Sequence, residues 1–513
     1  MQARMRTVVC ALCLLGVSCV APDPVDSRPA VPPAGGFQNA SLAAVGGSGG
    51  LAGSGGLSGA GGLVVPTDNP IGLASQSGSG AVVDAGNAPL GCRGLKCQQR
   101  VCPAGATTVS GRVYDPAGKN PLYNIAVYIP NDVVEPLKLG ASCGRCDSLY
   151  TGKAVTSALT DAEGRFTLQD APDGANIPLV IQIGKWRKQL TIPLVTACQD
   201  NAMPDKLLTL PRNHLEGDIP NIAISTGAAD TLECLLRRVG VDASEYVGGS
   251  ADTGRIHIFQ GTLGPIGSGG PNATRAAPNT NPAGPPSSSA LWNSAAELMK
   301  YDIVLLSCEG QETPSMNQQA LHEYANAGGR VFASHFHYAW FNSGPYAAEN
   351  LAMWTTGSQN LGDIPANIVT TFPKGKALAQ WLQSNNALTA GQLSIEQARH
   401  NADVSAANAV SQAWILAQSS DPNAGPTQYF SFNTPTTAGM TPDGPGTCGR
   451  VVFSDLHVGA ASHDNVDVAV PVSCANVDLS PQEKALEFML FDLSACVVPD
   501  DRPPLPPPVF DLN

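Results

Sequence analysis

The hydrophobic pattern changes its period at about residue 212, and this change restricts the fold of the chain more than any other feature. From residue 106 to 211, short segments such as Thr-Val-Ser-Gly-Arg-Val-Tyr alternate apolar and polar side chains between Asp-Pro-Ala-Gly and Asp-Ala-Glu-Gly turns. From residue 218 to 497, continuous apolar runs such as Ile-Val-Leu-Leu alternate with helical stretches. Alternation is typical of strands with one face in solvent, and continuous apolar runs are typical of buried parallel strands. We therefore predict a multidomain protein in which a small antiparallel β-sandwich is followed by a doubly wound α/β domain.

Spaced glycines, prolines and apolar residues mark the first unit, which we assign to residues 92–212 with a cysteine-rich start. The pattern consists of Gly111-x-Val113-x-Asp115-x-x-Gly118 with Pro121-Leu122, then Thr160-Asp161-x-x-Gly164-x-Phe166-x-Leu168, then Pro172-x-Gly174. It resembles the carboxypeptidase regulatory-like (transthyretin-like) domain. The resemblance implies a non-catalytic module that spaces, stabilises or binds.

Three strand motifs characterise the second unit, which we assign to residues 213–497. They are Tyr-Asp-Ile-Val-Leu-Leu-Ser from Tyr301, Ala-Gly-Gly-Arg-Val-Phe-Ala-Ser-His from Ala327, and Gly-Arg-Val-Val-Phe-Ser-Asp-Leu-His from Gly449. Their order resembles class I glutamine amidotransferase-like domains, most closely the trehalose-utilisation (ThuA-like) branch. Residues 261–289 are rich in Gly, Pro and Ser and are predicted to form a disordered insertion, and the Pro-rich tail 498–513 to be extended polyproline.

The N-terminal residues predict an export signal. Arg4 and Arg6 precede an apolar run that is too short to span a bilayer and that ends just before Cys19. The segment Leu-Leu-Gly-Val-Ser-Cys ending at Cys19 resembles the bacterial lipobox, which implies that Cys19 is acylated and becomes the first residue of the mature chain. Gly16 and Ser18 also satisfy the rule for ordinary secretory cleavage, which would release a soluble protein from the same cut.

We predict a signal peptide over residues 1–18 and a disordered Gly/Pro/Ser-rich tether over residues 19–91. The lipid anchor would make a membrane the first partner of the chain, and we place the protein in the cell envelope, on the outer membrane. The net charge of −13 gives no electrostatic reason to bind nucleic acid. Lys185-Trp186-Arg187-Lys188, the densest basic stretch, is interpreted as an exposed edge strand defended by charge.

Fourteen cysteines indicate a disulfide-bonded protein in an oxidising compartment. Cys10 and Cys13 leave with the signal peptide and Cys19 would carry lipid, so eleven remain and at least one thiol is free or pairs with another molecule. Cys143 and Cys146 have the C-x-x-C spacing of redox and zinc sites. No thioredoxin-like helix or second close pair follows them, so a local or cross-strand disulfide is the favoured prediction.

Polar residues collect where the predicted strands of the second unit end. One strand is followed by Ser-Cys-Glu-Gly, the next by His-Phe-His and the late one by Asp-Leu-His. The candidate ligand-binding residues are therefore Glu309, His335, His337, Trp340 and His463, beside Cys308, Asp455 and His457. Ligands bind at the carboxyl ends of strands in open α/β sheets. Residues two apart share one face of a strand, so we expect His335 with His337, and Asp455 with His457, to point the same way.

Three interpretations of this cluster remain open. His335, His337 and His457 are candidate ligands of a divalent metal such as zinc or iron. Cys308 is a candidate nucleophile with His457 as its base and Asp455 as the orienting carboxylate. A binding crevice without catalysis is the third, with aromatic neighbours that suit a carbohydrate or another small ligand. We predict a binding or scaffold protein, with a hydrolase or metal-dependent enzyme as the alternative.

Overall fold

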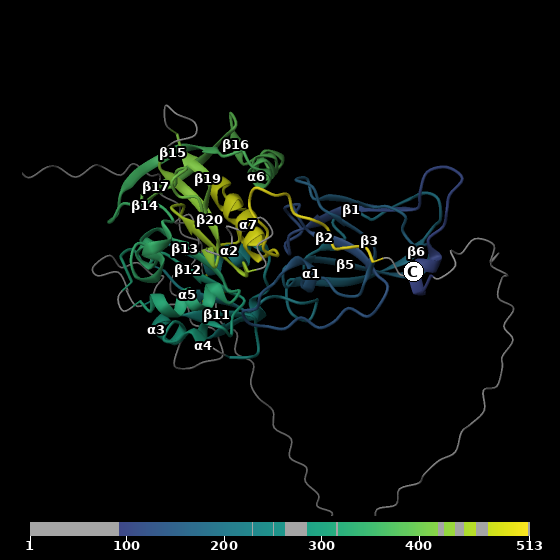
Figure 1. Ribbon diagram of the computed structural model, residues 1–513, viewed down its shortest axis with the longest axis horizontal. Helices are drawn as coiled ribbons and strands as arrows, with labels where there is room; N and C mark the ends of the chain where they lie inside the picture. The colour runs from purple at the N-terminus through teal and green to yellow at the C-terminus, as the bar shows by residue number, and fades with distance from the viewer. Residues whose placement is uncertain are drawn as a thin grey trace, which may run out of the picture. The chain divides into compact units, whose positions relative to one another are not determined.

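The computed structural model describes residues 92–227, 229–249, 251–261, 285–313, 316–418, 425–436, 446–457 and 470–510 (Figure 1). All of them belong to one compact unit, Ala81–Asn513. The predicted signal peptide, acylated Cys19 and tether lie outside the described residues, as do His463 and most of the predicted insertion. Within these ranges the fold is mixed α/β and rich in sheet, as expected, with several sheets and few helices.

Two four-stranded sheets form in the first half of the chain. One has the order β4-β1-β7 with β8 also paired to β1, and its strands are β1 (Thr108–Tyr114), β4 (Arg165–Leu168), β7 (Asp200–Ala202) and β8 (Leu208–Thr209). The other is antiparallel with the order β3-β2-β5-β6, and its strands are β2 (Ala126–Pro130), β3 (Ala154–Leu159), β5 (Gly174–Ile183) and β6 (Trp186–Val195). Apolar side chains from both sheets share one buried cluster, so they pack together.

The second half is built on an eleven-stranded sheet with the order β10-β11-β9-β12-β13-β21-β20-β19-β15-β17-β16. Its first six strands run parallel: β9 (Ile222–Ser225), β10 (Tyr246–Gly248), β11 (Ile256–Phe259), β12 (Ile303–Leu306), β13 (Arg330–Ser334) and β21 (Gly449–Ser454). The other five continue it antiparallel: β15 (Asn360–Ile368), β16 (Leu388–Thr389), β17 (Gln392–Arg399), β19 (Ser411–Ala417) and β20 (Thr427–Thr434). A small separate sheet pairs β14 (Met353–Trp354) with β18 (Ala402–Asp403).

Helices cover both faces of the parallel strands. The α-helices are α1 (Cys146–Leu149), α2 (Leu232–Val239), α3 (Ser288–Leu291), α4 (Ala295–Leu298), α5 (Gln318–Asn326), α6 (Pro373–Ser384) and α7 (Pro481–Ser494). The 3₁₀ helices are η1 (Gly94–Gln98), η2 (Ala243–Glu245), η3 (His335–Trp340) and η4 (Gly344–Glu349). Ile303 and Leu305 face the cluster that contains α2 and α7, and Val304 and Leu306 face the cluster that contains α4 and α5. Every residue of β12 is therefore buried, which explains its uninterrupted apolar sequence.

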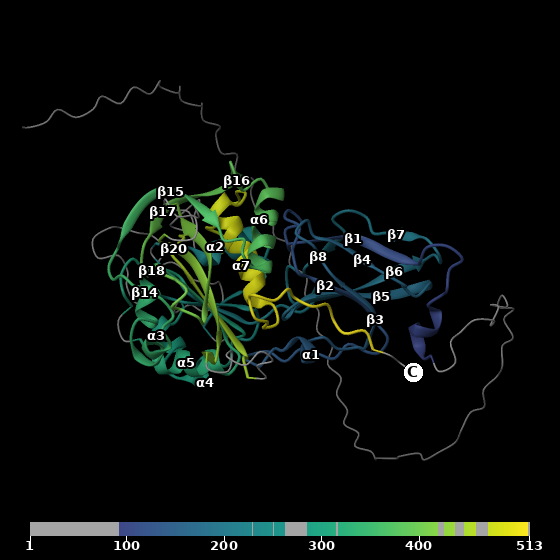
Figure 2. The same cartoon turned by 45° about the horizontal axis from the view of Figure 1, so that its top comes forward.

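The longest helix, α7, connects the two halves of the described chain (Figure 2). Ser480 caps its N-terminus in a capping box with Glu483, which fixes where the helix begins. Phe491 of α7 packs edge-to-face on Trp186 of β6, and Phe488 stacks on Tyr123 at ring centroid distances of 5.9 and 5.6 Å. A single hydrophobic cluster consequently runs through both halves without a break at residue 212.

Disulfides reinforce this connection. The bonds are Cys92–Cys97, Cys102–Cys198, Cys143–Cys448, Cys146–Cys496 and Cys234–Cys474, and Cys308 is the free cysteine of the described residues. The prediction of a local or cross-strand disulfide for the C-x-x-C cysteines is wrong, because the segment of Cys143 and Cys146 lies against the second half of the chain. Ala141 N–H donates to the Met299 carbonyl, and each thiol meets its own partner there. The five bonds indicate an oxidising, exported environment. No helix within the described ranges has the length and apolar character needed to cross a bilayer.

The stretch Lys185 to Lys188 is also different from the prediction. It does begin an edge strand, β6, but most of it is not exposed. Trp186 is fully buried, Arg187 is 2% exposed and pairs with Asp218 at 2.8 Å, and Lys185 pairs with Asp302. These charges hold the two halves together instead of repelling another strand.

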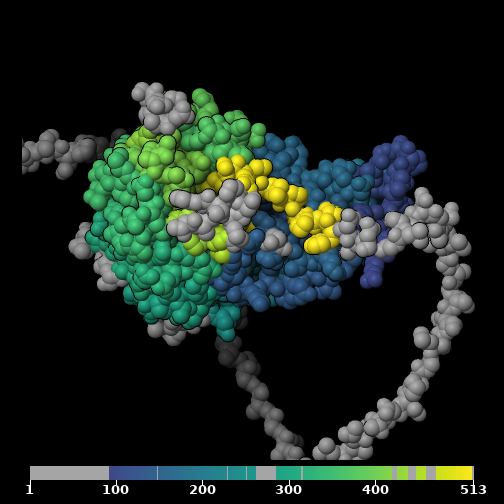
Figure 3. Space-filling view, in the orientation of Figure 1, coloured from purple at the N-terminus to yellow at the C-terminus, as the bar shows by residue number. Residues whose placement is uncertain are grey.

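The end of the Pro-rich tail lies along β3, where Val509 forms an isolated parallel bridge with Ala154. Ser157 Oγ–H donates to the Pro507 carbonyl at 2.6 Å, and Phe510 N–H donates to the Ala154 carbonyl at 3.2 Å. In the space-filling view this segment, in yellow, crosses the surface from the second half to the first (Figure 3). The tail therefore covers an edge that would otherwise present unpaired backbone groups.

Candidate functional site

Three of the predicted residues meet at the carboxyl ends of adjacent parallel strands. Cys308, His335 and His457 follow β12, β13 and β21, whose order in the sheet is also β12-β13-β21. Their ligand atoms all lie within 4.8 Å of one another. Cys308 Sγ is 3.3 Å from His335 Nδ1, and the His335 and His457 ring centroids are 4.9 Å apart. All three side chains are buried, with exposed fractions of 0%, 2% and 4%.

The backbone of His335 explains why its neighbour His337 is absent from this group. β13 ends at Ser334, His335 has a positive φ of 45°, and the 3₁₀ helix η3 begins there. Residues two apart on such a helix do not share a face, so the expectation taken from strand geometry is wrong. His337 Nδ1–H donates to the Ser334 carbonyl at 3.0 Å, and its Nε2 accepts from Thr313 Oγ1 at 3.4 Å. The third member of the cluster is Cys308 instead of His337.

The predicted triad is also rearranged. The imidazole that contacts the Cys308 thiol is His335, whereas the sequence prediction paired the thiol with His457. Asp455 is fully buried, and its Oδ2 accepts the Asn401 N–H at 2.7 Å. Burial raises the pKa of Asp455 to about 8, which favours its neutral form. Asp455 thus fixes the backbone of Asn401, and its other oxygen, Oδ1, is buried without a hydrogen-bond partner, so this carboxyl group does not orient an imidazole.

A backbone carbonyl sets the tautomer of His335. His335 Nε2 lies 3.2 Å from the Ser358 carbonyl, which can only accept, so Nε2 carries the proton. His335 Nδ1 therefore presents its lone pair to Cys308 Sγ, and the neutral thiol donates to it. His457 differs from His335 in its hydrogen bonding, because His457 Nε2 is buried without a hydrogen-bond partner.

Burial dominates the electrostatics of the cluster. Desolvation, with His457 and Arg399 nearby, lowers the pKa of His335 to about 3. Desolvation and Arg399 lower the pKa of His457 to about 3 as well. Burial, together with the Asp230 carboxylate, raises the pKa of the Cys308 thiol. At neutral pH both imidazoles are uncharged and the thiol is protonated.

Sequence reasoning missed the residues that hold the cluster in place. Asp230, just before α2, accepts the Cys308 N–H at 3.3 Å and also the Ser334 hydroxyl. It therefore ties the end of β12 to the end of β13. The Ser358 carbonyl and the Arg399 charge come from segments elsewhere in the chain. A local motif does not reveal them, because each acts through a long-range contact.

Other predicted site residues have different surroundings. Trp340 is fully buried in the hydrophobic core and packs edge-to-face on Trp292 at 5.2 Å between ring centroids. Glu309 is buried, and its side chain lies beside Gly261. A Cβ atom added to Gly261 would come within 3.3 Å of the Glu309 side chain. Phe336 lies against the His335 ring at a centroid distance of 4.1 Å. The aromatic character of this segment thus serves mainly the core, and Phe336 is the aromatic neighbour in contact with the cluster.

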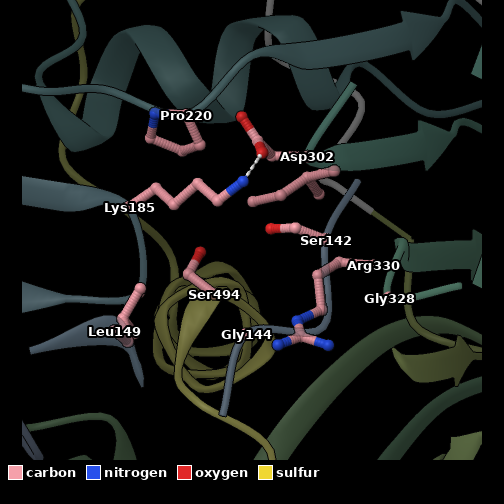
Figure 4. Close-up of a pocket in the computed structure, with 11 residues that line it drawn as sticks. Ser142, Gly144, Leu149, Lys185, Pro220, Asp302, Gly328, Arg330 and Ser494 are labelled. Atoms are coloured by element: carbon pink, nitrogen blue, oxygen red, sulfur yellow. Dashed lines mark hydrogen bonds and ion pairs between the residues drawn. The ribbon is translucent and has the colours of Figure 1, made fainter. Parts of the chain in front are cut away.

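A hollow lies at the opposite, amino ends of the same strands, between the two halves (Figure 4). Asp302 and Arg330, at the starts of β12 and β13, line it together with Lys185 of the first half. Lys185 Nζ–H donates to Asp302 Oδ1 and, at 2.7 Å, to the Gly140 carbonyl. Arg330 donates to the Cys448 and Ala495 carbonyls. The charged groups of this hollow are therefore already satisfied by the protein.

No family model matches the chain, and no curated protein matches it. Among solved structures, a C-terminal interface mutant of a type II cohesin–X-dockerin complex from Acetivibrio cellulolyticus aligns at 18% identity and a TM-score of 0.14, covering 28% of this chain and 78% of that one. An N-terminal interface mutant of that complex aligns at 15% identity and a TM-score of 0.14, covering 29% of this chain and 88% of that one. A 9R-lipoxygenase from Cyanothece PCC8801 aligns at 13% identity and a TM-score of 0.10, covering 22% of this chain and 17% of that one. TM-scores this low carry no argument about fold or function.

Proposed function

We propose that this chain is an exported, lipid-anchored envelope protein that binds a small ligand at the carboxyl ends of its parallel strands, as a binding or scaffold protein. One observation carries the proposal: Cys308, His335 and His457 converge there, although their positions span about 150 residues of the sequence. Buried polar groups that converge without pairing fully among themselves are typical of a ligand site.

The architecture supports this assignment. The two packed four-stranded sheets are consistent with a β-sandwich of the carboxypeptidase regulatory-like type. The six parallel strands with helices on both faces are consistent with a doubly wound domain of the amidotransferase-like, ThuA-like type. We propose that the first presents the second at the end of the tether.

The state of the thiol favours binding over thiol hydrolysis. A cysteine nucleophile reacts as its thiolate, and catalytic cysteines lie in partly exposed, electropositive places that lower the thiol pKa. Cys308 is fully buried, and burial and Asp230 raise its pKa. A hydrolase or metal-dependent enzyme acting on a small ligand, including a carbohydrate, is the second candidate, and the metal-ligand character of the three side chains is what favours it.

The anchor is proposed from Cys19. Wild-type protein should partition into the detergent phase and with membranes, whereas Cys19→Ser should still be exported but remain in the aqueous phase. Equal membrane partition of the two proteins would show that Cys19 does not carry the anchor.

Thermal unfolding of the purified chain with a panel of mono- and disaccharides tests the binding site. A ligand of the cluster should raise the Tm of the wild type and of His322→Asn, a control on α5 whose partner is Glu349, but not of His457→Asn. The assignment would be overturned by hydrolysis of the sugar or of a model ester or amide that disappears in Cys308→Ala. Stabilisation that survives in His457→Asn would place the ligand elsewhere.

A further inference from the structure

The cluster has the donor set of a transition-metal site. A cysteine sulfur and two imidazoles are ligands that zinc accepts at about 2.3 Å and about 2.0–2.1 Å, respectively. Tetrahedral geometry then puts a sulfur and a nitrogen ligand about 3.6 Å apart. Cys308 Sγ and His335 Nδ1 are 3.3 Å apart, and all three ligand atoms lie within 4.8 Å. Small side-chain movements would therefore bring them to bonding distance of one ion.

The groups around the cluster prepare it for a cation. The Ser358 carbonyl fixes the His335 tautomer, so that Nδ1 offers a lone pair toward Cys308, and a hydrogen bond of this kind orients most metal-ligating histidines. The buried His457 Nε2 has no hydrogen-bond partner, which is costly in a folded protein unless a ligand satisfies it.

We propose that Cys308, His335 and His457 bind one Zn²⁺, and that the small ligand of the proposed function binds next to, or directly to, this ion. On binding, the Cys308 S–H bond breaks, sulfur bonds to Zn²⁺, and the proton passes to solvent. The Asp230 carboxylate, which accepts the Cys308 N–H, and the thiolate together offset the two positive charges of the ion. Arg399 is the opposing charge near the cluster.

The number of ligands indicates what kind of zinc site this is. Structural zinc sites have four protein ligands, whereas catalytic or ligand-binding sites have three and keep a position for water or another small molecule. The described part of the chain supplies three. The inference rests on the proposed function, since it concerns the same residues, and it names the group that would attract the ligand.

Metal analysis of the full exported chain tests this proposal. After loading with Zn²⁺ and removal of the excess, the wild type should retain one equivalent, and Cys308→Ser and His457→Asn should each lower the affinity at least tenfold. His337→Gln and His322→Asn are the matched controls and should retain the metal, because neither side chain belongs to the cluster. Replacement of zinc by Co²⁺ should give a thiolate-to-cobalt absorption band that disappears in Cys308→Ser.

Each remaining outcome decides the matter. Retention of zinc by Cys308→Ser and His457→Asn, or its loss in His337→Gln with native circular dichroism, would overturn the assignment of ligands. Stoichiometric binding of Cu⁺ with Zn²⁺ excluded would overturn the assignment to zinc. Absence of metal binding, together with a sugar-induced Tm shift that depends on His457, would refute this inference and leave the proposed function standing.

Discussion

The two ends of the parallel strands contrast sharply. At the amino ends, Lys185 pairs with Asp302, and Arg330 donates to two backbone carbonyls. At the carboxyl ends, Cys308, His335 and His457 are buried and uncharged, and His457 keeps an unpartnered nitrogen. The polar groups at the amino ends join two halves of the protein, whereas those at the carboxyl ends form the site where we propose that a small ligand binds. In this sheet, paired charges form the junction between the halves, and the proposed ligand site contains a buried, neutral nitrogen without a hydrogen-bond partner, His457 Nε2.

The largest change in stability should come from removing the disulfides that join the two halves near the amino ends of the strands. Removing both the Cys143–Cys448 and Cys146–Cys496 bonds by serine substitution should lower the free energy of unfolding by about 5 kcal/mol, because loops of 305 and 350 residues are no longer closed in the unfolded chain. Either bond alone should matter less, since the other still joins the same segments. Chemical denaturation followed by tryptophan fluorescence measures both. Equal effects of the single and double changes would contradict this account.

The buried ion pair should come next. Lys185→Met leaves Asp302, with a side chain only 6% exposed, without its cation, and should cost about 3 kcal/mol of unfolding free energy. Lys188→Met is the matched control on the same strand, because Lys188 meets a partly exposed Glu216 at 3.8 Å and should change stability by less than about 1 kcal/mol. Similar losses in the two variants would show that the Lys185 pair is no more important than a surface pair.

A smaller effect, of opposite sign, should appear where two carboxyl groups meet between β1 and α7. Burial raises the pKa of Asp115 to about 6, and burial with Asp115 raises that of Glu487. Raised carboxyl pKa values favour the protonated folded state, so the stability that this pair contributes is greatest below about pH 4 and falls as the pH rises through 6. Glu487→Gln should therefore stabilise the protein by about 2 kcal/mol at pH 8 and flatten the pH dependence between 4 and 6.

Thermal unfolding of the wild type and of Glu487→Gln from pH 4 to 8 checks the predicted pH dependence. Asp115 is held by the Lys119 and Asn120 N–H groups, and Asn120 also donates to Glu487 at 2.7 Å, so the amide introduced by Glu487→Gln can keep a hydrogen bond there. Asp478→Asn, at an exposed pair with Lys119, is the control and should change little. A loss of stability in Glu487→Gln at pH 8 would mean that the Glu487 carboxyl group stabilises the folded protein at that pH, which contradicts a raised pKa.

The strand ends that form the site were predictable because buried parallel strands appear in the sequence as continuous apolar runs. The apolar runs before Cys308, His335 and His457 located three strand ends, and the ends of neighbouring parallel strands meet. The apolar pattern did not predict the backbone conformation of the residues that follow each strand. The positive φ of His335 separates it from His337, and Asp455 reaches Asn401. Those outcomes depend on loops whose partners lie far away in the sequence.

The connection between the halves was the least predictable part of the fold. A C-x-x-C spacing describes only how close two thiols are along the chain, and Cys143 and Cys146 each bond to a cysteine more than 300 residues away. Burial of Trp186 and Arg187 likewise follows from α7 and Asp218, which a local reading of four basic and aromatic residues does not show. The sequence predicts a domain boundary at residue 212, and one hydrophobic cluster contains residues from both sides of it.

The disulfides also determine what proteolytic nicking would do to this protein. Cys143, Cys146 and Cys234 precede the predicted insertion at residues 261–289, and their partners Cys448, Cys496 and Cys474 follow it. A protease that cuts within the insertion therefore produces two polypeptides held by three covalent links. Such a protein would migrate as one band in non-reducing electrophoresis and as two after reduction. An exported protein exposed to extracellular proteases would thus keep both polypeptides, and the groups at both ends of its parallel strands, in a single molecule after being cut.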